Sequence, residues 1–73
     1  MARPPQLEAA ITVLEEALAS LEAARDAKPA DLADARFCLG DALVRADRTD
    51  RAEALLLAAF ATYEAEATLA PRL

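Results

Sequence analysis

The side chains that most often carry out catalysis or hold metal ions are scarce in this sequence. It contains no histidine, so it lacks the usual general base near neutral pH and the imidazole ligand of most zinc and haem sites. The tightest carboxylate groups are Glu15 with Glu16 and Glu64 with Glu66. Adjacent or alternate residues of a helix point in different directions, which is poor geometry for one metal ion or one acid–base pair. We therefore expect no catalytic residue, no metal site and no cofactor, and a protein that is not an enzyme.

The one cysteine, Cys38, offers little chemistry either. A lone cysteine cannot form an internal disulfide or a four-thiolate metal site. Asp34 and Asp41 are nearby in the sequence and disfavour a thiolate, so we expect Cys38 to be a small packing residue. A lone cysteine fits a reducing compartment, and no apolar leader stretch points to secretion. Together these features predict a cytoplasmic protein.

Three arginines, Arg45, Arg48 and Arg51, recur at every third residue. In a helix-turn-helix DNA reader such residues would lie near phosphates. However, the net charge is −5, with 13 acidic and 8 basic residues, and this balance opposes binding to a polyanion. We expect no nucleic acid partner and predict that the arginines pair with acids of the same turn region. These acids are Asp47, Asp50 and Glu53.

The composition favours helices along nearly the whole chain. Apolar residues make up 56% of the 73 residues, about half of them are alanine, and there is one glycine. Alanine, leucine, glutamate and arginine are all strong helix formers. The longest uncharged run, residues 54–63, is about half of the ~20 residues that a membrane span needs. The sequence therefore predicts one small all-α domain, residues 1–73, that does not enter a membrane.

The spacing of apolar residues and prolines predicts three helices, at about 5–27, 30–46 and 51–68. Pro29 separates the first two, since a proline disfavours helical geometry in the residue before it. Asp50, followed by Glu53, predicts a capping box at the start of the third helix. Because the connections are short, neighbouring helices should be antiparallel.

The third helix has apolar residues on two faces. The stripe expected to face the core comprises Ala52, Leu56, Ala59, Phe60, Tyr63 and Ala67. A second stripe lies roughly opposite and comprises Ala54, Leu57, Ala58, Ala61 and Ala65. Three helices cannot cover both stripes, and alanines let a second helix come close. We therefore expect self-association through the second stripe, in its simplest form as a homodimer.

Residues 33–66 resemble one tetratricopeptide repeat (TPR), a helix-turn-helix unit of 34 residues. The matching positions, counted from Ala33, are Leu39-Gly40, Leu43, Ala52, Ala59 and Phe60. The helix before them resembles the second helix of a preceding repeat more loosely. The resemblance implies a TPR-like helical hairpin plus one N-terminal helix, in which small residues at Gly40, Ala52 and Ala59 let two helices pack closely. An ordinary alanine-rich three-helix bundle stays open as the other interpretation.

In TPR proteins, one face of the first helix of the unit lines a groove for peptides or partner helices. By resemblance, the partner-facing residues are Asp34, Phe37, Asp41, Val44 and Arg45. An alternative is that Phe37 covers the edge of the core or packs on the first helix. If the face is exposed, an aromatic ring between two acids favours a partner segment with a basic and an apolar residue.

Two hypotheses on function follow. The first is a non-enzymatic protein–protein interaction module of TPR type that binds a protein or peptide, self-associates, or does both. The alternative is a structural, self-associating helical bundle without a peptide-binding groove. The sequence does not identify a partner.

Overall fold

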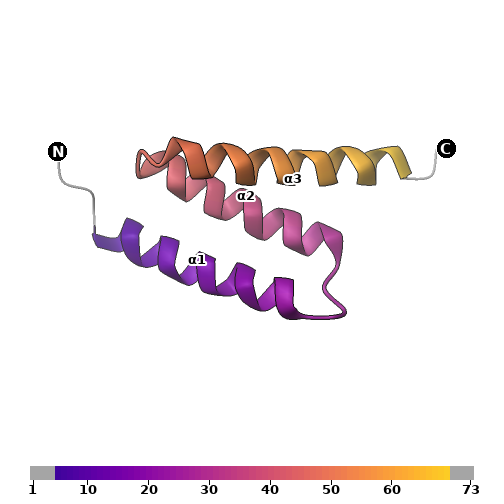
Figure 1. Ribbon diagram of the computed structural model, residues 1–73, viewed down its shortest axis with the longest axis horizontal. Helices are drawn as coiled ribbons and strands as arrows, with labels where there is room; N and C mark the ends of the chain where they lie inside the picture. The colour runs from indigo at the N-terminus through magenta and orange to yellow at the C-terminus, as the bar shows by residue number, and fades with distance from the viewer. Residues whose placement is uncertain (1–4, 70–73) are drawn as a thin grey trace.

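The computed structural model describes residues 5–69, and the side chains of residues 6–67. Three helices, α1 (Pro5–Ala23), α2 (Pro29–Arg45) and α3 (Thr49–Leu69), follow one another in the chain. Helix α2 runs antiparallel to α1, and α3 runs antiparallel to α2 (Figure 1). No strand occurs within residues 5–69. The predicted all-α class with three antiparallel helices is confirmed.

The middle helix, α2, holds the other two together. It packs against α1 on one side and against α3 on the other, whereas the backbones of α1 and α3 stay apart in the part of the chain that the structure describes. The outer helices therefore splay, with α2 between them (Figure 1). As a result, α3 is covered by a neighbouring helix on one side only.

The first helix ends earlier than predicted, at Ala23 instead of residue 27. Its last turn tightens, with the Ala24 N–H donating to the Leu21 carbonyl three residues back. Residues 22–26 are all exposed, so no packing holds the helix together beyond this point. Lys28 is extended, and α2 begins at Pro29, where a missing N–H costs nothing.

The turn between α2 and α3 closes with a Schellman motif. The Arg48 N–H donates to the Leu43 carbonyl at 2.8 Å, and the Asp47 N–H donates to the Val44 carbonyl at 3.1 Å. Asp47 has a φ of 61°, the left-handed conformation that glycine adopts most easily. The predicted capping box is wrong in register, because α3 begins at Thr49 and Asp50 lies within its first turn.

The core is small and rich in alanine. Its buried residues are Ile11, Leu18, Ala33, Leu39, Ala42, Leu43, Ala46, Ala52 and Ala59. The small side chains let α2 and α3 approach closely, as predicted for Gly40, Ala52 and Ala59. A Cβ on Gly40 would lie 2.8 Å from Leu56 Cγ and 3.5 Å from the Ala52 carbonyl oxygen. Leu56 therefore occupies the space that a side chain at position 40 would need.

The inward face of α3 differs from the predicted stripe at Phe60 and Leu55, and Ala67 of that stripe is exposed. Phe60 was expected in the core, but its side chain is 49% exposed. Leu55, outside the predicted stripe, packs against the core cluster in its place. The reason is the position of α2, which covers Ala52 and Ala59 and leaves Phe60 at the edge of the contact.

Candidate functional site

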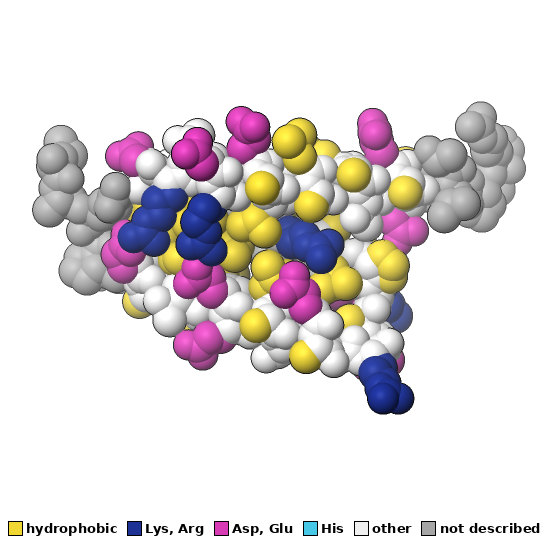
Figure 2. Space-filling model, viewed as in Figure 1, with side chains coloured by type: hydrophobic (Ala, Val, Ile, Leu, Met, Phe, Trp, Pro, Cys, Tyr) yellow, Lys and Arg dark blue, Asp and Glu magenta, His cyan; other side chains and the backbone are white. Residues whose placement is uncertain are grey.

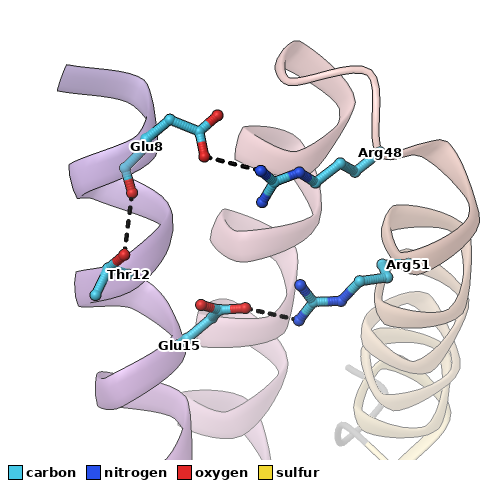
Figure 3. Close-up of polar contacts among 5 residues, drawn as sticks. All are labelled: Glu8, Thr12, Glu15, Arg48 and Arg51. Atoms are coloured by element: carbon cyan, nitrogen blue, oxygen red, sulfur yellow. Dashed lines mark hydrogen bonds and ion pairs between the residues drawn. The ribbon is translucent and has the colours of Figure 1, made fainter. Parts of the chain in front are cut away.

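Within the described residues, three ion pairs link α1 to the other helices and the turn, and we call them the Glu–Arg ladder. They are Glu8–Arg48 at 2.9 Å, Glu15–Arg51 at 2.8 Å and Glu22–Arg36 at 3.6 Å. The glutamates lie seven residues apart, about two helical turns, so they share one face of α1. Figure 3 shows the first two pairs, with the side chains reaching across from opposite sides of α2.

The ladder corrects the predicted partners of the arginines. Arg48 and Arg51 pair with α1 and not with acids of their own turn. Arg45 pairs with Asp41, one turn back on α2, at 3.3 Å. Long side chains in the turn can reach another helix, which local spacing does not reveal.

A groove of about 380 Å³ lies along the ladder, between α1 and α3. Its apolar residues include Leu18, Leu39 and Leu55, and its charged residues are Glu15, Glu22 and Arg51. Figure 2 shows basic side chains lying between acidic ones, above apolar atoms, on this face. Each of these charged residues belongs to a ladder pair, so none of them is left without an ion-pair partner for a ligand to replace.

The opposite side of α2 meets α3 in a row of facing residues. Asp34 faces Tyr63 and Phe37 faces Phe60, and the Cα of Gly40 faces Leu56. The same antiparallel register places Val44 level with Glu53, one turn further along. We call Asp34, Phe37, Val44, Phe60 and Tyr63 the α2–α3 seam.

The aromatic rings form the centre of this seam. The ring of Phe37 lies 6.0 Å from that of Phe60, with a tilt of 59°, and 6.5 Å from that of Tyr63, with a tilt of 58°. Tilted rings at such separations interact favourably. Phe37 nevertheless stays 41% exposed and Val44 46% exposed. The seam is thus an ordered apolar surface that water still reaches.

A hydrogen bond fixes one end of the seam. The hydroxyl of Tyr63 donates to Asp34 Oδ1 at 2.6 Å. This bond to a carboxylate, aided by desolvation and the negative charge of Asp34, raises the pKa of Tyr63 to about 12. Tyr63 is therefore a neutral donor at physiological pH, and its ring is held next to Phe37.

All five residues predicted to face a partner are exposed: Asp34, Phe37, Asp41, Val44 and Arg45. Phe37 packs on Phe60 and Tyr63 of α3, and among the described residues no contact with α1 is observed for its ring. Its half-exposed position at the rim of the α2–α3 contact agrees with the alternative in which it covers the edge of the core. The structure brings Phe60 and Tyr63 to this surface, which the sequence analysis missed. The available signal was that both are aromatic and lie three residues apart, on one edge of the same helix.

The stripe predicted for self-association is exposed on α3 at all five positions: Ala54, Leu57, Ala58, Ala61 and Ala65. Among the described side chains of α3, Leu57 is the most exposed large hydrophobic residue, at 61%. Leu57 comes three residues, nearly one turn, before Phe60, so this stripe and the seam adjoin. Whether two copies pair here stays a prediction.

Other candidate chemistry is weak. Cys38 is exposed, so the prediction of a packing residue is wrong. Among the described residues, no group of three or more cysteines and carboxylates could hold a metal ion. Within the same residues, no helix is both long and apolar enough to cross a membrane.

Comparisons with protein-family models, with curated proteins and with solved structures give no match to this chain.

Proposed function

We propose that this protein is a non-enzymatic interaction module that binds a protein or peptide partner on the α2–α3 seam. The observation that supports this most directly is the pair of half-exposed rings, Phe37 and Phe60, in contact across two helices. A contiguous, rigid apolar surface marks an interaction site more often than scattered exposed residues do. Aromatic side chains also dominate the energy of protein–protein contacts.

The packing of α2 on α3 also favours a TPR-like module. Gly40, Ala52 and Ala59 are buried where the two helices touch, as the resemblance requires. Such a hairpin presents one side of its first helix to a partner, and here that side holds Phe37 and Val44. We therefore extend the proposal to a TPR-like hairpin preceded by α1.

The test is a selection of binders from a displayed library of random and helical peptides, followed by affinity measurements on variants. Phe37→Ser and Phe60→Ser should each reduce the affinity of selected peptides by about tenfold or more, as losing a contact of this kind does. Val13→Ser is the matched control, because Val13 is 64% exposed but lies on α1, away from the seam. Circular dichroism checks that each variant is folded.

Two results would contradict this function. One is a set of binders whose affinity depends on Val13 as much as on Phe60. The other is a selection that yields no binder while the protein is shown to be folded.

A second function, self-association, is favoured by the exposed α3 stripe and especially by Leu57. We infer that two copies pair through these residues, in place of or in addition to partner binding. Sedimentation equilibrium at high micromolar concentration should give the mass of a dimer. Leu57→Glu and Ala61→Glu should give a monomer, because each would bury an unpaired charge. A monomeric wild-type chain at that concentration would exclude this candidate.

A further inference from the structure

The charges around the α2–α3 seam are unbalanced. Asp34 lies at its aromatic end, Asp41 lies one turn from both Phe37 and Val44, and Glu53 lies level with Val44. Of the bases within α2 and α3, Arg36 and Arg51 turn to α1. In the part of the chain that the structure describes, this leaves Arg45 on the seam side, where it already pairs with Asp41.

The opposite side of α2 shows how a helix docks on this protein. There α1 inserts Ile11 and Leu18, seven residues apart, into the core. Its glutamates, also seven residues apart, reach arginines of α2, of the turn and of α3. Apolar residues in one row and charges in the next row therefore form the docking pattern. On the seam the apolar row is also present. The charged residues beside it are mainly acidic, whereas those that meet α1 are arginines.

We propose that the α2–α3 seam binds an amphipathic helix of another protein, with a row of lysines or arginines beside its apolar row. This inference rests on the proposed function and specifies the partner. The apolar row would pack on Phe37, Phe60 and Val44, and the basic side chains would meet Asp34 and Glu53. Complementary charge of this kind selects partners and speeds association.

The dimensions of the seam fit such a helix. From Asp34 to Val44 the seam follows α2 for ten residues, or about 15 Å at the rise of an α-helix. A partner helix of about three turns covers this length. Two antiparallel helices form a furrow along their axes, and an amphipathic helix lays its apolar face into such a furrow.

A second copy of this chain fits the seam less well. Pairing two seams about a two-fold axis would bring acids against acids. Arg36, Arg48 and Arg51 of the second copy would be held in its own ladder. Charge therefore favours a basic partner over self-pairing at this surface.

The experiment uses three labelled synthetic helices of about 18 residues with identical leucine rows, a length at which an isolated peptide can be helical in water. Their flanking positions are all lysine, all glutamine or all glutamate. Fluorescence anisotropy measures their affinity for the whole chain at low and at high salt. At low salt, we expect the lysine helix to bind at least about tenfold more tightly than the glutamate helix. High salt should reduce this difference in affinity. NMR shift changes should include the Phe37, Phe60 and Tyr63 amides.

A double variant, Asp34→Asn with Glu53→Gln, separates the seam from general charge attraction. It should remove most of the preference, which is the ratio of the affinities of the lysine helix and the glutamate helix for the same variant. The matched control is Glu16→Gln with Asp26→Asn, which removes the same net charge from exposed positions outside the seam. This control should keep the preference.

Each other outcome overturns the inference in a recognisable way. Equal binding of the three helices at the seam would refute the basic partner and leave the proposed function standing. If the control double variant removes the preference equally, the preference arises from the net charge of the chain and not from the seam. Binding of none of the helices, or binding that maps to α1, would contradict both the inference and the proposed function.

Discussion

The two long sides of α2 both carry apolar and charged residues, but they differ in how fully a neighbouring helix covers them. On the α1 side, large apolar residues are buried and the charges of the Glu–Arg ladder cancel. On the α3 side, the backbones pack through alanine and glycine, and the large apolar residues stay half-exposed at the rim. The first side shows what a docked helix looks like in this protein. The second has the apolar row of such a contact without the helix that would complete it.

The difference also explains where stability and where recognition should reside. A side chain that is already buried contributes to folding, whereas one that water still reaches can contribute to binding later. Leu18 belongs to the first kind and Phe60 to the second. If the two sides have these separate roles, mutations on them should affect different measurements.

The largest expected effect is that of Leu18→Ala, on the α1 side. Deleting a buried leucine side chain should cost about 2–5 kcal/mol of unfolding free energy, which in a chain of this size leaves much of it unfolded. Phe60→Ala, on the seam, should cost about 1 kcal/mol, since the ring is half-exposed and loses mainly its contact with Phe37. Urea denaturation followed by circular dichroism measures both. An equal loss of unfolding free energy in the two variants would contradict the proposed separate roles of the two sides of α2.

The next effect concerns the close contact beneath the seam. Gly40→Leu should destabilise the protein by about 1–3 kcal/mol, because Leu56 fills the space that the new side chain needs. Gly40→Ala is the milder companion: its Cβ requires Leu56 to shift, and alanine regains up to about 1 kcal/mol of helix propensity. Thermal melts of the three proteins should rank wild type and Gly40→Ala above Gly40→Leu. An unchanged melting temperature for Gly40→Leu would mean that α2 and α3 pack more loosely than described.

A smaller effect should distinguish paired charges from unpaired ones. Glu15→Gln breaks one pair of the ladder and should cost about 0.2–1 kcal/mol, less at high salt, because the pair is partly exposed. Glu53→Gln, beside the seam, should change stability by less than about 0.5 kcal/mol. The measurement is denaturation of both variants at two salt concentrations. A larger cost for Glu53→Gln than for Glu15→Gln would contradict the assignment of charges to the two sides.

The smallest effect is confined to alkaline pH. The folded protein raises the pKa of Tyr63 to about 12, above the ordinary value of 10.0. The stabilisation by its hydroxyl is therefore complete below pH 10 and is lost as the pH rises towards 12. The chain has one tyrosine and no tryptophan, so absorbance titration reports this group alone. Asp34→Asn should move the midpoint back towards 10.0, and a wild-type midpoint already near 10.0 would refute the hydrogen bond at the seam.

Some of this architecture could be predicted because it depends on neighbours in the chain. Pro29 interrupts the helical pattern, and the three- and four-residue spacing of Leu39 and Leu43 identifies the inward face of α2. Both features were confirmed. The end of α1 was not, because alanines after Ala23 remain good helix formers and only the absence of packing ends the helix there.

The candidate site divides in the same way. The spacing of Phe37 and Val44 sets them off from the core stripe of α2, and this predicted their exposure. Phe60 was predicted to lie in the core, because periodicity does not distinguish residues at the centre of an apolar face from those at its edge. The arginine partners were wrong because a long side chain at a turn has both local and distant acids within reach.

By itself, therefore, the sequence determined the three helices, their antiparallel order and the face of α2 that is buried, since each follows from residues within a few turns of one another. The tertiary structure alone decided which helix covers each edge. It brought Glu8, Glu15 and Glu22 to arginines that come later in the chain, and it placed Phe37 on Phe60 and Tyr63 at the rim. The physical reason is that helical periodicity defines which side chains share a face, whereas the packing of α1 and α3 on α2 determines whether that face meets protein or water.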